Sequence, residues 1–258
     1  MITLRTKRYA VFETAGHHKK TCLEDLVVVR GGQDGKYLCA SFARKMQQYG
    51  SCILRDVVSE DVAVEATVNL TPLVNALCAM YDAAGDEFEG VDLEALGIVR
   101  LPRIGRGKHN VHLDPYESDC HAALVRLLEA SGICALLSEW TGKTCSVRET
   151  GFSLTTARGG EGMEWHSDGS EGEYTVLMAL VDVTQEQGTL GVVPGSHLAF
   201  VPGRGHGDIA HNDYSDADVR YAYRAGQPIV NDARTIHGVD RNSSDRWRVV
   251  TWYILDVY

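Results

Sequence analysis

The sequence has no apolar run long enough to cross a membrane as a helix, which needs about 20 residues. Its longest apolar stretch, YTVLMALVDV, begins at Tyr174 and has the length of a β-strand. The opening segment, MITLRTKRYAVFETAGHHKK, also lacks the continuous apolar region of a secretory signal. We therefore expect a cytoplasmic protein with no transmembrane segment and no membrane partner.

Basic residues are in deficit as well. The chain carries 25 Lys and Arg against 35 Asp and Glu, which gives a formal net charge of -10 and a pI near 5.4. Sequence-independent affinity for nucleic acid comes from clustered Lys and Arg side chains. The composition therefore argues against a nucleic-acid partner.

Paired cysteine motifs are missing too. The cysteines are seven in number, stand at irregular spacing and form no CxxC pair. An odd, irregular set of this kind indicates small buried hydrophobic residues in a reducing compartment. The seven are Cys22, Cys39, Cys52, Cys78, Cys120, Cys134 and Cys145.

The sequence contains no internal repeat and no low-complexity tract. Its hydrophobic share of 44% and charged share of 23% are those of a soluble globular protein. A length of 258 residues predicts one large domain rather than two. We expect residues 1–40, which contain the loop-like GGQDG segment, to be an appendage of unknown role, and residues 41–258 to form the domain.

Helical patterns follow the predicted appendage. The segment SFARKMQQYG predicts a short helix that ends at Gly50, and SCILRDVV then predicts a strand. Thr71 before Pro72 has the pattern of an N-cap followed by a first-turn proline. Apolar residues recur at helical spacing after it, so we expect a packed helix that begins at Thr71.

The predicted secondary structure changes from helices to strands near the middle of the chain. A further helix is expected from Ser118 or Asp119 to about Trp140, and Gly142 ends it. From Val147 onward, Gly, Pro, Asn and Asp separate the short β-rich runs FSLTTA, YTVLMALVDV, TLGVVPG, QPIVND and WRVVTWYIL. This order predicts an α+β fold, in which N-terminal helices buttress a double-stranded β-helix, the jelly-roll or cupin-like barrel.

The segment EWHSDG offers two metal ligands. His166 and Asp168 are separated by one residue, so in extended backbone both side chains project from the same side. His237, in NDARTIHG, follows another predicted strand that could bring it alongside. Two histidines and one carboxylate form a facial triad, which leaves three positions open on octahedral Fe(II). His-x-Asp also occurs by chance, and a single histidine is more often a surface or core residue.

An arginine near the end of the chain could bind an anionic co-substrate. Arg248 shares a strand face with Val250, Trp252 and Ile254 by period-two alternation, so it should point into the core. A buried guanidinium needs an anionic partner, and a dicarboxylate can supply one through two parallel hydrogen bonds. The alternatives are an ordinary salt bridge at the end of the barrel, or Arg246 as the residue that binds the anion.

Three motifs together resemble the phytanoyl-CoA dioxygenase family, which includes ectoine hydroxylase. They are HSD, QGTLGVVPGSH and HGVDRNSSDRWR, and the similarity extends from about Tyr49 to Val257. The resemblance implies that His166, Asp168 and His237 bind Fe(II), and that Arg248 binds 2-oxoglutarate.

The same resemblance assigns roles to further residues. Ser153, Thr155 and Leu177 occupy positions at which the family contacts the co-substrate. Asn242, Ser244 and the turn from Pro194 to His197 match scaffold positions. Side chains flanking the ligand strand are candidates for the substrate pocket, namely Arg158, Trp165, Glu173 and Tyr174.

The reaction that the resemblance implies consumes O2 and converts 2-oxoglutarate to succinate and CO2 while a C–H bond of a small molecule is oxidised. Hydroxylation is the default outcome, and desaturation, cyclisation, epoxidation or demethylation stay open. Asp168 disfavours halogenation, because the halogenases of the family carry a small residue at this position. The EWHSDG segment hints at a small polar or zwitterionic substrate.

Two other functions stay open at this level. One is a cupin-like metalloenzyme that uses no keto acid, and the other is a catalytically silent binding or sensing protein with the same fold. Two further histidine pairs, His17 with His18 and His109 with His112, lack a third ligand at useful spacing. The identity of the substrate and the oligomeric state do not follow from the sequence.

Overall fold

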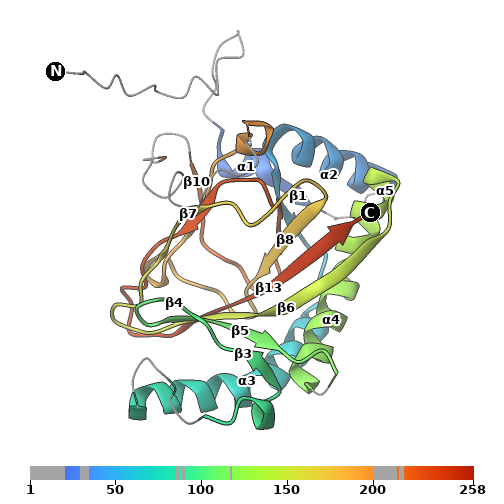
Figure 1. Ribbon diagram of the computed structural model, residues 1–258. Helices are drawn as coiled ribbons and strands as arrows, with labels where there is room; N and C mark the ends of the chain where they lie inside the picture. The colour runs from blue at the N-terminus through green and yellow to red at the C-terminus, as the bar shows by residue number, and fades with distance from the viewer. Residues whose placement is uncertain are drawn as a thin grey trace, which may run out of the picture.

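The computed structural model describes residues 21–29, 35–84, 88, 91–116, 118–199, 214 and 218–258. Two β-sheets form a barrel, and helices lie along the outer side of the larger sheet (Figure 1). The α-helices are α1 (Leu23–Leu26), α2 (Gly35–Tyr49), α3 (Glu60–Ala84), α4 (Asp119–Ser131) and α5 (Ile133–Thr141). The short 3-10 helices are η1 (Glu94–Leu96), η2 (Gln185–Gln187) and η3 (Ser196–Ala199).

The strands divide between a sheet of nine and a sheet of four. From β6 to β13 the chain passes back and forth between the two sheets, with β9 and β10 consecutive in the smaller sheet, as in a double-stranded β-helix. The larger sheet has the order β1 (Val27–Val29), β2 (Ser51–Arg55), β11 (Ile229–Asp232), β8 (Glu173–Met178), β13 (Arg248–Val257), β6 (Cys145–Thr155), β5 (Lys108–Leu113) and β3 (Ile98–Arg100), and β4 (Arg103–Gly105) also pairs with β5. The smaller sheet has the order β10 (Val219–Tyr221), β9 (Leu190–Val192), β12 (His237–Val239) and β7 (Met163–His166). The predicted α+β fold with a double-stranded β-helix is confirmed.

Strand β13 shows how the sequence builds the two sides of the larger sheet. Tyr253 and Leu255 belong to the apolar core that the sheet shares with the helices. Arg248 and Trp252 lie on the opposite side and line the cavity between the sheets. Successive side chains of a strand point to opposite faces, so one strand serves both the core and the site.

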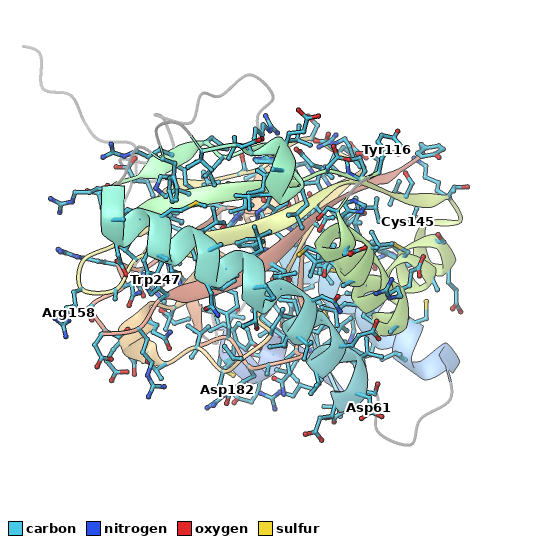
Figure 2. The ribbon with its side chains drawn as sticks, turned by 90° about the horizontal axis from the view of Figure 1, so that it is seen from below. Asp61, Tyr116, Cys145, Arg158, Asp182 and Trp247 are labelled. Atoms are coloured by element: carbon cyan, nitrogen blue, oxygen red, sulfur yellow. The ribbon has the colours of Figure 1, made fainter. Side chains whose placement is uncertain are left out.

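Helix α3 begins eleven residues before the predicted start at Thr71. Thr71 is not an N-cap, because its hydroxyl donates a hydrogen bond of 2.7 Å to the carbonyl of Thr67 within the helix. Pro72 removes one backbone donor from the exposed side of α3, while Leu70 and Leu77 are buried in the core. Packing of this apolar face outweighs the local signal of a helix start, and Figure 2 shows α3 crossing the near side of the molecule.

The length and composition of α3 also match those of a membrane-spanning helix. Within Glu60–Ala83, a stretch of 18 residues has a mean hydropathy of 1.4, and 22% of that stretch is buried. The buried residues follow one stripe of the helix, which packs against α4. The absence of a transmembrane segment stays a prediction.

The helix predicted from Asp119 to Trp140 is two helices, α4 and α5, bent by 53° relative to each other. Gly132 stands between them with φ of 71°, a left-handed conformation that glycine adopts without steric strain. The predicted start and end are confirmed, since Ser118 caps α4 by accepting from the backbone N–H of His121. Gly142 ends α5, again with a left-handed backbone.

Part of the predicted N-terminal appendage lies in the main fold. Strand β1 pairs in parallel with β2 at the edge of the larger sheet. Helix α2 begins at Gly35 and ends at Tyr49, so the predicted boundary at residue 40 falls inside it. The predicted end of this helix at Gly50 is confirmed. The predictions for residues 1–20 lie outside the described residues.

All seven cysteines are free thiols. Cys39 and Cys52 are buried, as predicted, and four others are partly buried. Cys22 is exposed, so the prediction of burial was wrong for it, because it stands just outside the N-terminus of α1 rather than inside an element.

Candidate metal centre and its cavity

The two predicted histidine ligands lie on neighbouring strands of the smaller sheet. His166 ends β7 and His237 begins β12, and the register of the two strands places them directly opposite each other. Their ring centroids are 4.2 Å apart. Nδ1 of His166 lies 2.7 Å from the carbonyl oxygen of Glu164, and Nδ1 of His237 lies 3.1 Å from that of Thr235. A neutral ring that donates from Nδ1 keeps the lone pair of Nε2 for a metal.

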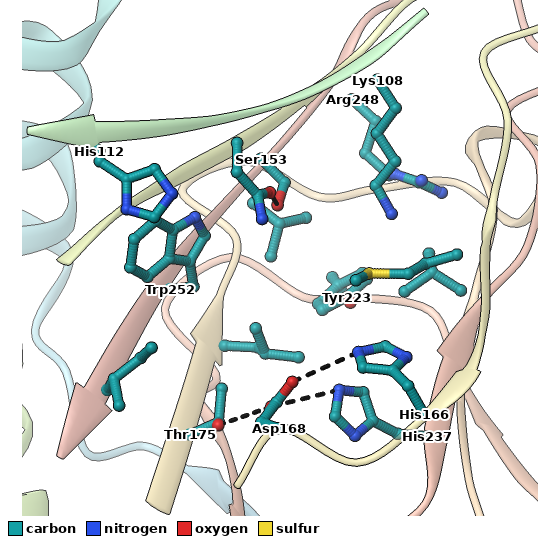
Figure 3. A pocket seen from close by; sticks show the side chains of 16 residues that line it. Lys108, His112, Ser153, His166, Asp168, Thr175, Tyr223, His237, Arg248 and Trp252 are labelled. Atoms are coloured by element: carbon teal, nitrogen blue, oxygen red, sulfur yellow. Dashed lines mark hydrogen bonds and ion pairs between the residues drawn. The ribbon is translucent and has the colours of Figure 1, made fainter. Parts of the chain in front are cut away.

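Asp168 completes the group from the loop after β7. Its backbone N–H donates to the carbonyl of Ala233, which turns the chain so that the carboxylate faces both histidines (Figure 3). The carboxylate oxygens lie 3.3 Å from Nε2 of His166 and 3.4 Å from Nε2 of His237. Thr175 donates to the same carboxylate at 2.6 Å. Burial alone would raise the pKa of Asp168, but these three neighbours hold it far below its usual range, so the carboxylate is ionised.

These three side chains fit a divalent transition metal. One ligand atom from each of His166, Asp168 and His237 lies within 4.8 Å of the others. Two imidazole nitrogens and one carboxylate on one side leave the opposite side of an octahedral ion to other ligands, as in non-haem Fe(II) oxygenases. The contacts from Nδ1 and from Thr175 fix the orientation of all three ligands.

Arg248 lies in the same cavity as the metal ligands. Its side chain is buried, and its guanidinium donates to the carbonyls of Gln187 and Asp240 and to the hydroxyl of Thr155, at 2.6, 2.9 and 3.3 Å. Within the described part of the chain, no carboxylate lies within salt-bridge distance of it. Arg246 is exposed, so the structure places Arg248 and not Arg246 at the cavity.

A second cation, which the sequence motifs did not indicate, lies beside Arg248. Lys108 is 2% exposed and lines the cavity from β5. Burial, followed by the nearby charge of Arg248, lowers the pKa of Lys108 to about 7. The signal in the sequence was the alternation in KHNVHL, which sets Lys108, Asn110 and His112 on one side of a strand otherwise rich in buried residues.

The cavity lies between the two sheets. The larger sheet forms one wall from cross-strand rows of β5, β6 and β13, and the metal ligands stand on the other side (Figure 3). The rows are Lys108–Thr155–Arg248, then Asn110–Ser153–Val250, then His112–Gly151–Trp252. The cavity therefore has a cationic end at the first row and an uncharged end at the third.

The predicted co-substrate contacts lie close to this cavity. Ser153 and Leu177 line it, and Thr155 meets the guanidinium of Arg248. The hydroxyl of Ser153 donates to Oδ1 of Asn110 at 2.6 Å. Their contact with a co-substrate stays a prediction.

The four side chains predicted from their flanking positions lie elsewhere, and none of them lines the cavity, namely Arg158, Trp165, Glu173 and Tyr174. Trp165 points to the opposite face of the smaller sheet, where it packs against the ring of Tyr214. Glu173 forms an ion pair with Arg148. Arg158 is exposed at the edge of the molecule (Figure 2). Adjacent residues on a strand face opposite sides, so nearness to His166 in sequence was a poor guide.

The predicted scaffold role of Asn242 and Ser244 is confirmed by their contacts. The buried amide of Asn242 donates to the carbonyls of Thr156 and Arg246, at 2.9 and 2.7 Å. Its oxygen accepts from both the backbone and the hydroxyl of Ser244. These bonds hold the loop that leads into β13 and so fix the start of the strand at Arg248.

The PGSH turn likewise has a scaffold role. The hydroxyl of Ser196 donates to the carbonyl of Val193 and accepts from the N–H of Ile236. This pair of bonds ties the turn to the residue before His237. The turn thereby supports the position of His237, a predicted metal ligand.

Among the described residues, the second histidine pair, His109 with His112, does not form a metal site. His17 and His18 lie outside the described residues. His109 packs against Phe88 on the helical side of the sheet, whereas His112 faces the cavity. Among the described residues, the triad of His166, Asp168 and His237 is the group that could hold a metal ion.

Several solved structures have a similar fold. The non-heme alpha ketoglutarate dependent epimerase SnoN from nogalamycin biosynthesis is 22% identical, with a TM-score of 0.59 over 85% of this chain and 83% of its own. The corresponding carbocyclase SnoK is 20% identical, with a TM-score of 0.56 over 87% and 84%. EctD from S. alaskensis is 18% identical, with a TM-score of 0.56 over 87% and 77%. At these identities the similarity indicates a shared fold.

The family comparison covers most of the chain. No curated protein matches the sequence at a significant level. Residues 46–250 match the family described as phytanoyl-CoA dioxygenase (PhyH), and this range includes the metal triad, Lys108 and Arg248. The chain therefore belongs to the phytanoyl-CoA dioxygenase (PhyH) family.

Proposed function

We propose that the protein is an Fe(II)- and 2-oxoglutarate-dependent oxygenase that oxidises a C–H bond of a small molecule, with hydroxylation as the outcome. Family membership supports the class of enzyme. The observation that carries the proposal is that Arg248 lies in the same cavity as a facial triad. Arg248 is buried there and has no carboxylate partner among the described residues. A dicarboxylate keto acid would satisfy both ends of this arrangement.

Each part of the site has a role in this proposal. His166, Asp168 and His237 would hold the iron, which when bound supplies the coupling of O2 reduction to conversion of 2-oxoglutarate into succinate and CO2. Arg248 would bind the far carboxylate of 2-oxoglutarate, with Lys108 as a second positive group. Held at both ends, the co-substrate cannot rotate, which fixes its orientation before the reaction.

The lining of the cavity would protect the reaction. Apolar surface surrounds the proposed metal ligands and the cationic end, and it comes from Met163, Leu177, Val239 and Val250. Apolar walls exclude bulk water and strengthen the electrostatic attraction between Arg248 and a bound carboxylate.

The co-substrate assignment can be tested by spectroscopy without knowing the substrate. The purified protein is incubated anaerobically with Fe(II) and 2-oxoglutarate, and the visible metal-to-ligand charge-transfer band is recorded. We expect the band in the wild type, its loss in His237→Ala, and a strong weakening in Arg248→Ala that higher 2-oxoglutarate partly restores. Arg246→Ala, which removes an exposed arginine two residues away, is the matched control and should keep the band.

The alternative functions give different outcomes. A wild type that binds Fe(II) but shows no band with 2-oxoglutarate would favour the cupin-like enzyme that uses no keto acid. A normal band without any succinate under O2, even with a broad set of small molecules, would favour a silent binding protein. Mass spectrometry of the product, with labelled O2, would separate hydroxylation from epimerisation or ring closure.

A further inference from the structure

The end of the cavity away from Arg248 has a different chemical character. We call it the His112 end and define it by His112, Asn110, Ser153 and Trp252, which lie in the second and third cross-strand rows. All four side chains line the cavity, and Figure 3 shows His112 and Trp252 on the side opposite Arg248 and Lys108. None of the four carries a fixed charge.

The ring of His112 is held in one orientation. Its Nδ1 lies 2.5 Å from Oε1 of Glu149, and Arg100 donates to the same oxygen from the other side at 2.8 Å. Burial is the largest influence on the pKa of His112 and, despite the opposing effect of Glu149, the pKa is lowered, so the ring is neutral. A neutral ring that donates from Nδ1 to Glu149 presents Nε2 as a hydrogen-bond acceptor. Nε2 has no partner among the residues that the structure describes.

Asn110 presents donors to the same space. Its Oδ1 already accepts from the hydroxyl of Ser153, which sets the amide so that Nδ2 is left for another partner. Across the described chain, Nδ2 of Asn110 has no acceptor. The side-chain amide therefore offers N–H groups to a ligand.

Trp252 adds an aromatic wall with one more donor. Only 6% of the residue is exposed, and its Nε1 has no hydrogen-bond acceptor within the described residues. Its ring packs edge-on against His112 at a centroid distance of 4.8 Å. Gly151 faces both rings from β6, and an added Cβ there would lie 2.7 Å from Cζ2 of Trp252. The glycine thus clears the space in which the indole lies.

The charge of the His112 end decides which ligands it can take. The ionic groups beside it, Arg100 and Glu149, are paired with each other. The remaining walls include Leu177 and Ile254, which are apolar. A charged ligand group would be buried here without a counter-charge, which is unfavourable, whereas a hydroxyl and a neutral oxygen can both be satisfied.

We propose that the His112 end binds the primary substrate, and that this substrate is a neutral ring compound with a hydroxyl group that donates to His112 Nε2 and a second oxygen that accepts from Asn110. This inference rests on the proposed function, because it assigns the cationic end to 2-oxoglutarate. Glu149 is a positioning residue that keeps the acceptor nitrogen of His112 turned to the cavity. The hint of a zwitterionic substrate in EWHSDG is not retained, since Trp165 faces away from the cavity.

Matched small probes test the proposed substrate class. Binding of 4-hydroxyacetophenone, acetophenone and 4-hydroxybenzoate is measured by calorimetry on the anaerobic enzyme loaded with Fe(II) and 2-oxoglutarate. The first has a neutral hydroxyl and a carbonyl, the second lacks the hydroxyl, and the third replaces the ketone by a carboxylate. We expect the first to bind at least about fivefold more tightly than either of the others, as one hydrogen bond allows. Equal affinities, a preference for the carboxylate, or no binding of any of the three would overturn the proposal.

Variants then locate the preference on the residues. His112→Phe should abolish the discrimination between 4-hydroxyacetophenone and acetophenone, and Glu149→Leu should weaken it. Glu149→Gln, which keeps an acceptor for Nδ1, should restore it. His121→Phe, on the partly exposed side of α4, is the control and should retain the wild-type preference.

The charge-transfer band separates the two proposals. His112→Phe should keep the band obtained with Fe(II) and 2-oxoglutarate, because it leaves the triad and Arg248 intact. A wild type without the band would mean that the proposed function fails. If the wild type shows the band but His112→Phe keeps the preference among the probes, then the assignment of the His112 end alone is wrong.

Discussion

At the scale of single residues, the site depends on hydrogen bonds that orient its ligands. Thr175 reaches from β8 in the larger sheet to the carboxylate of Asp168, whose neighbours His166 and His237 belong to the smaller sheet. The three predicted metal ligands are thereby fixed relative to both walls of the cavity. Such supporting contacts contribute substantially to metal affinity.

Removing the hydroxyl of Thr175 should therefore weaken metal binding. We expect Thr175→Val to lower Fe(II) affinity roughly 10- to 100-fold, because Asp168 loses the bond that fixes its carboxylate. Anaerobic Fe(II) titration measures the change. Thr251→Val removes a buried hydroxyl that bonds to Met178 away from the site, and it should leave the affinity unchanged. An equal loss in both variants would show that general destabilisation is the cause.

Lys108 should destabilise the ligand-free protein at neutral and acidic pH. Its pKa is about 7 in the folded protein and 10.5 as an ordinary lysine, so the unfolded chain binds more protons between these values. Below pH 7 the buried charge of Lys108 lowers the free energy of unfolding by its full amount. This destabilisation disappears as the pH rises toward 10.5. The difference of 3.5 pKa units corresponds to at most about 5 kcal/mol.

The variant Lys108→Met tests this reasoning. Without co-substrate, we expect its free energy of unfolding to exceed that of the wild type by a few kcal/mol at low pH, with the gain shrinking toward high pH. Saturating 2-oxoglutarate should also shrink the gain, because a carboxylate supplies the missing counter-charge. Urea denaturation across the pH range measures both effects, and a gain that is constant with pH would contradict the assigned pKa.

At the scale of the elements, the cavity depends on the register of β5, β6 and β13. Cross-strand rows place cationic, amide and aromatic side chains at successive levels of one wall. A shift of one residue in any of the three strands would turn its cavity side chains toward the helices. Gly151 stands at the centre of the third row, between His112 and Trp252.

A side chain at position 151 should disturb this register. A Cβ added to Gly151 would collide with the carbonyl oxygen of Val111 and with Trp252. We expect Gly151→Ala to lower the free energy of unfolding on the order of 2–4 kcal/mol, since the backbone of β5 must shift. In Gly142→Ala, where no atom lies within 4 Å of the added Cβ, only the left-handed backbone should cost about 1 kcal/mol. Equal denaturation midpoints for the two variants would contradict the argument.

At the scale of the whole molecule, the proposed co-substrate would link the two sheets of the barrel. Lys108 comes from β5 and Arg248 from β13, while the metal ligands belong to the other side of the barrel. A ligand that bridges them can bind only the folded protein, so its binding free energy adds to the stability of the fold. The stabilisation is about 2.7 kcal/mol when the free ligand is at 100 times its dissociation constant.

Thermal denaturation can separate the contributions of metal and keto acid. We expect Fe(II) alone to raise the melting temperature of the wild type under anaerobic conditions, and 2-oxoglutarate to raise it further. Arg248→Ala should keep the rise in melting temperature caused by Fe(II) and lose most of the rise caused by 2-oxoglutarate. Arg246→Ala should keep both rises in melting temperature. An unchanged 2-oxoglutarate increment in Arg248→Ala would remove this residue from the proposed binding site.

The sequence by itself determined those features that depend on neighbouring residues. One-residue spacing brought His166 and Asp168 to one side of the chain, and period-two alternation with Val250, Trp252 and Ile254 directed Arg248 into the cavity. Glycines with left-handed backbones marked the ends of helices at Gly50 and Gly142. These signals are local, because they follow from the geometry of a few consecutive residues.

Only the tertiary structure decided which distant residues share the cavity. Lys108 and the pair of His112 with Glu149 depend on the register of β5 and β6, which no local pattern specifies. Packing against α4 also extended α3 through Pro72, against the local signal for a helix start. Strand pairing and packing join residues far apart in the chain, and their energies outweigh local preferences of about 1–3 kcal/mol.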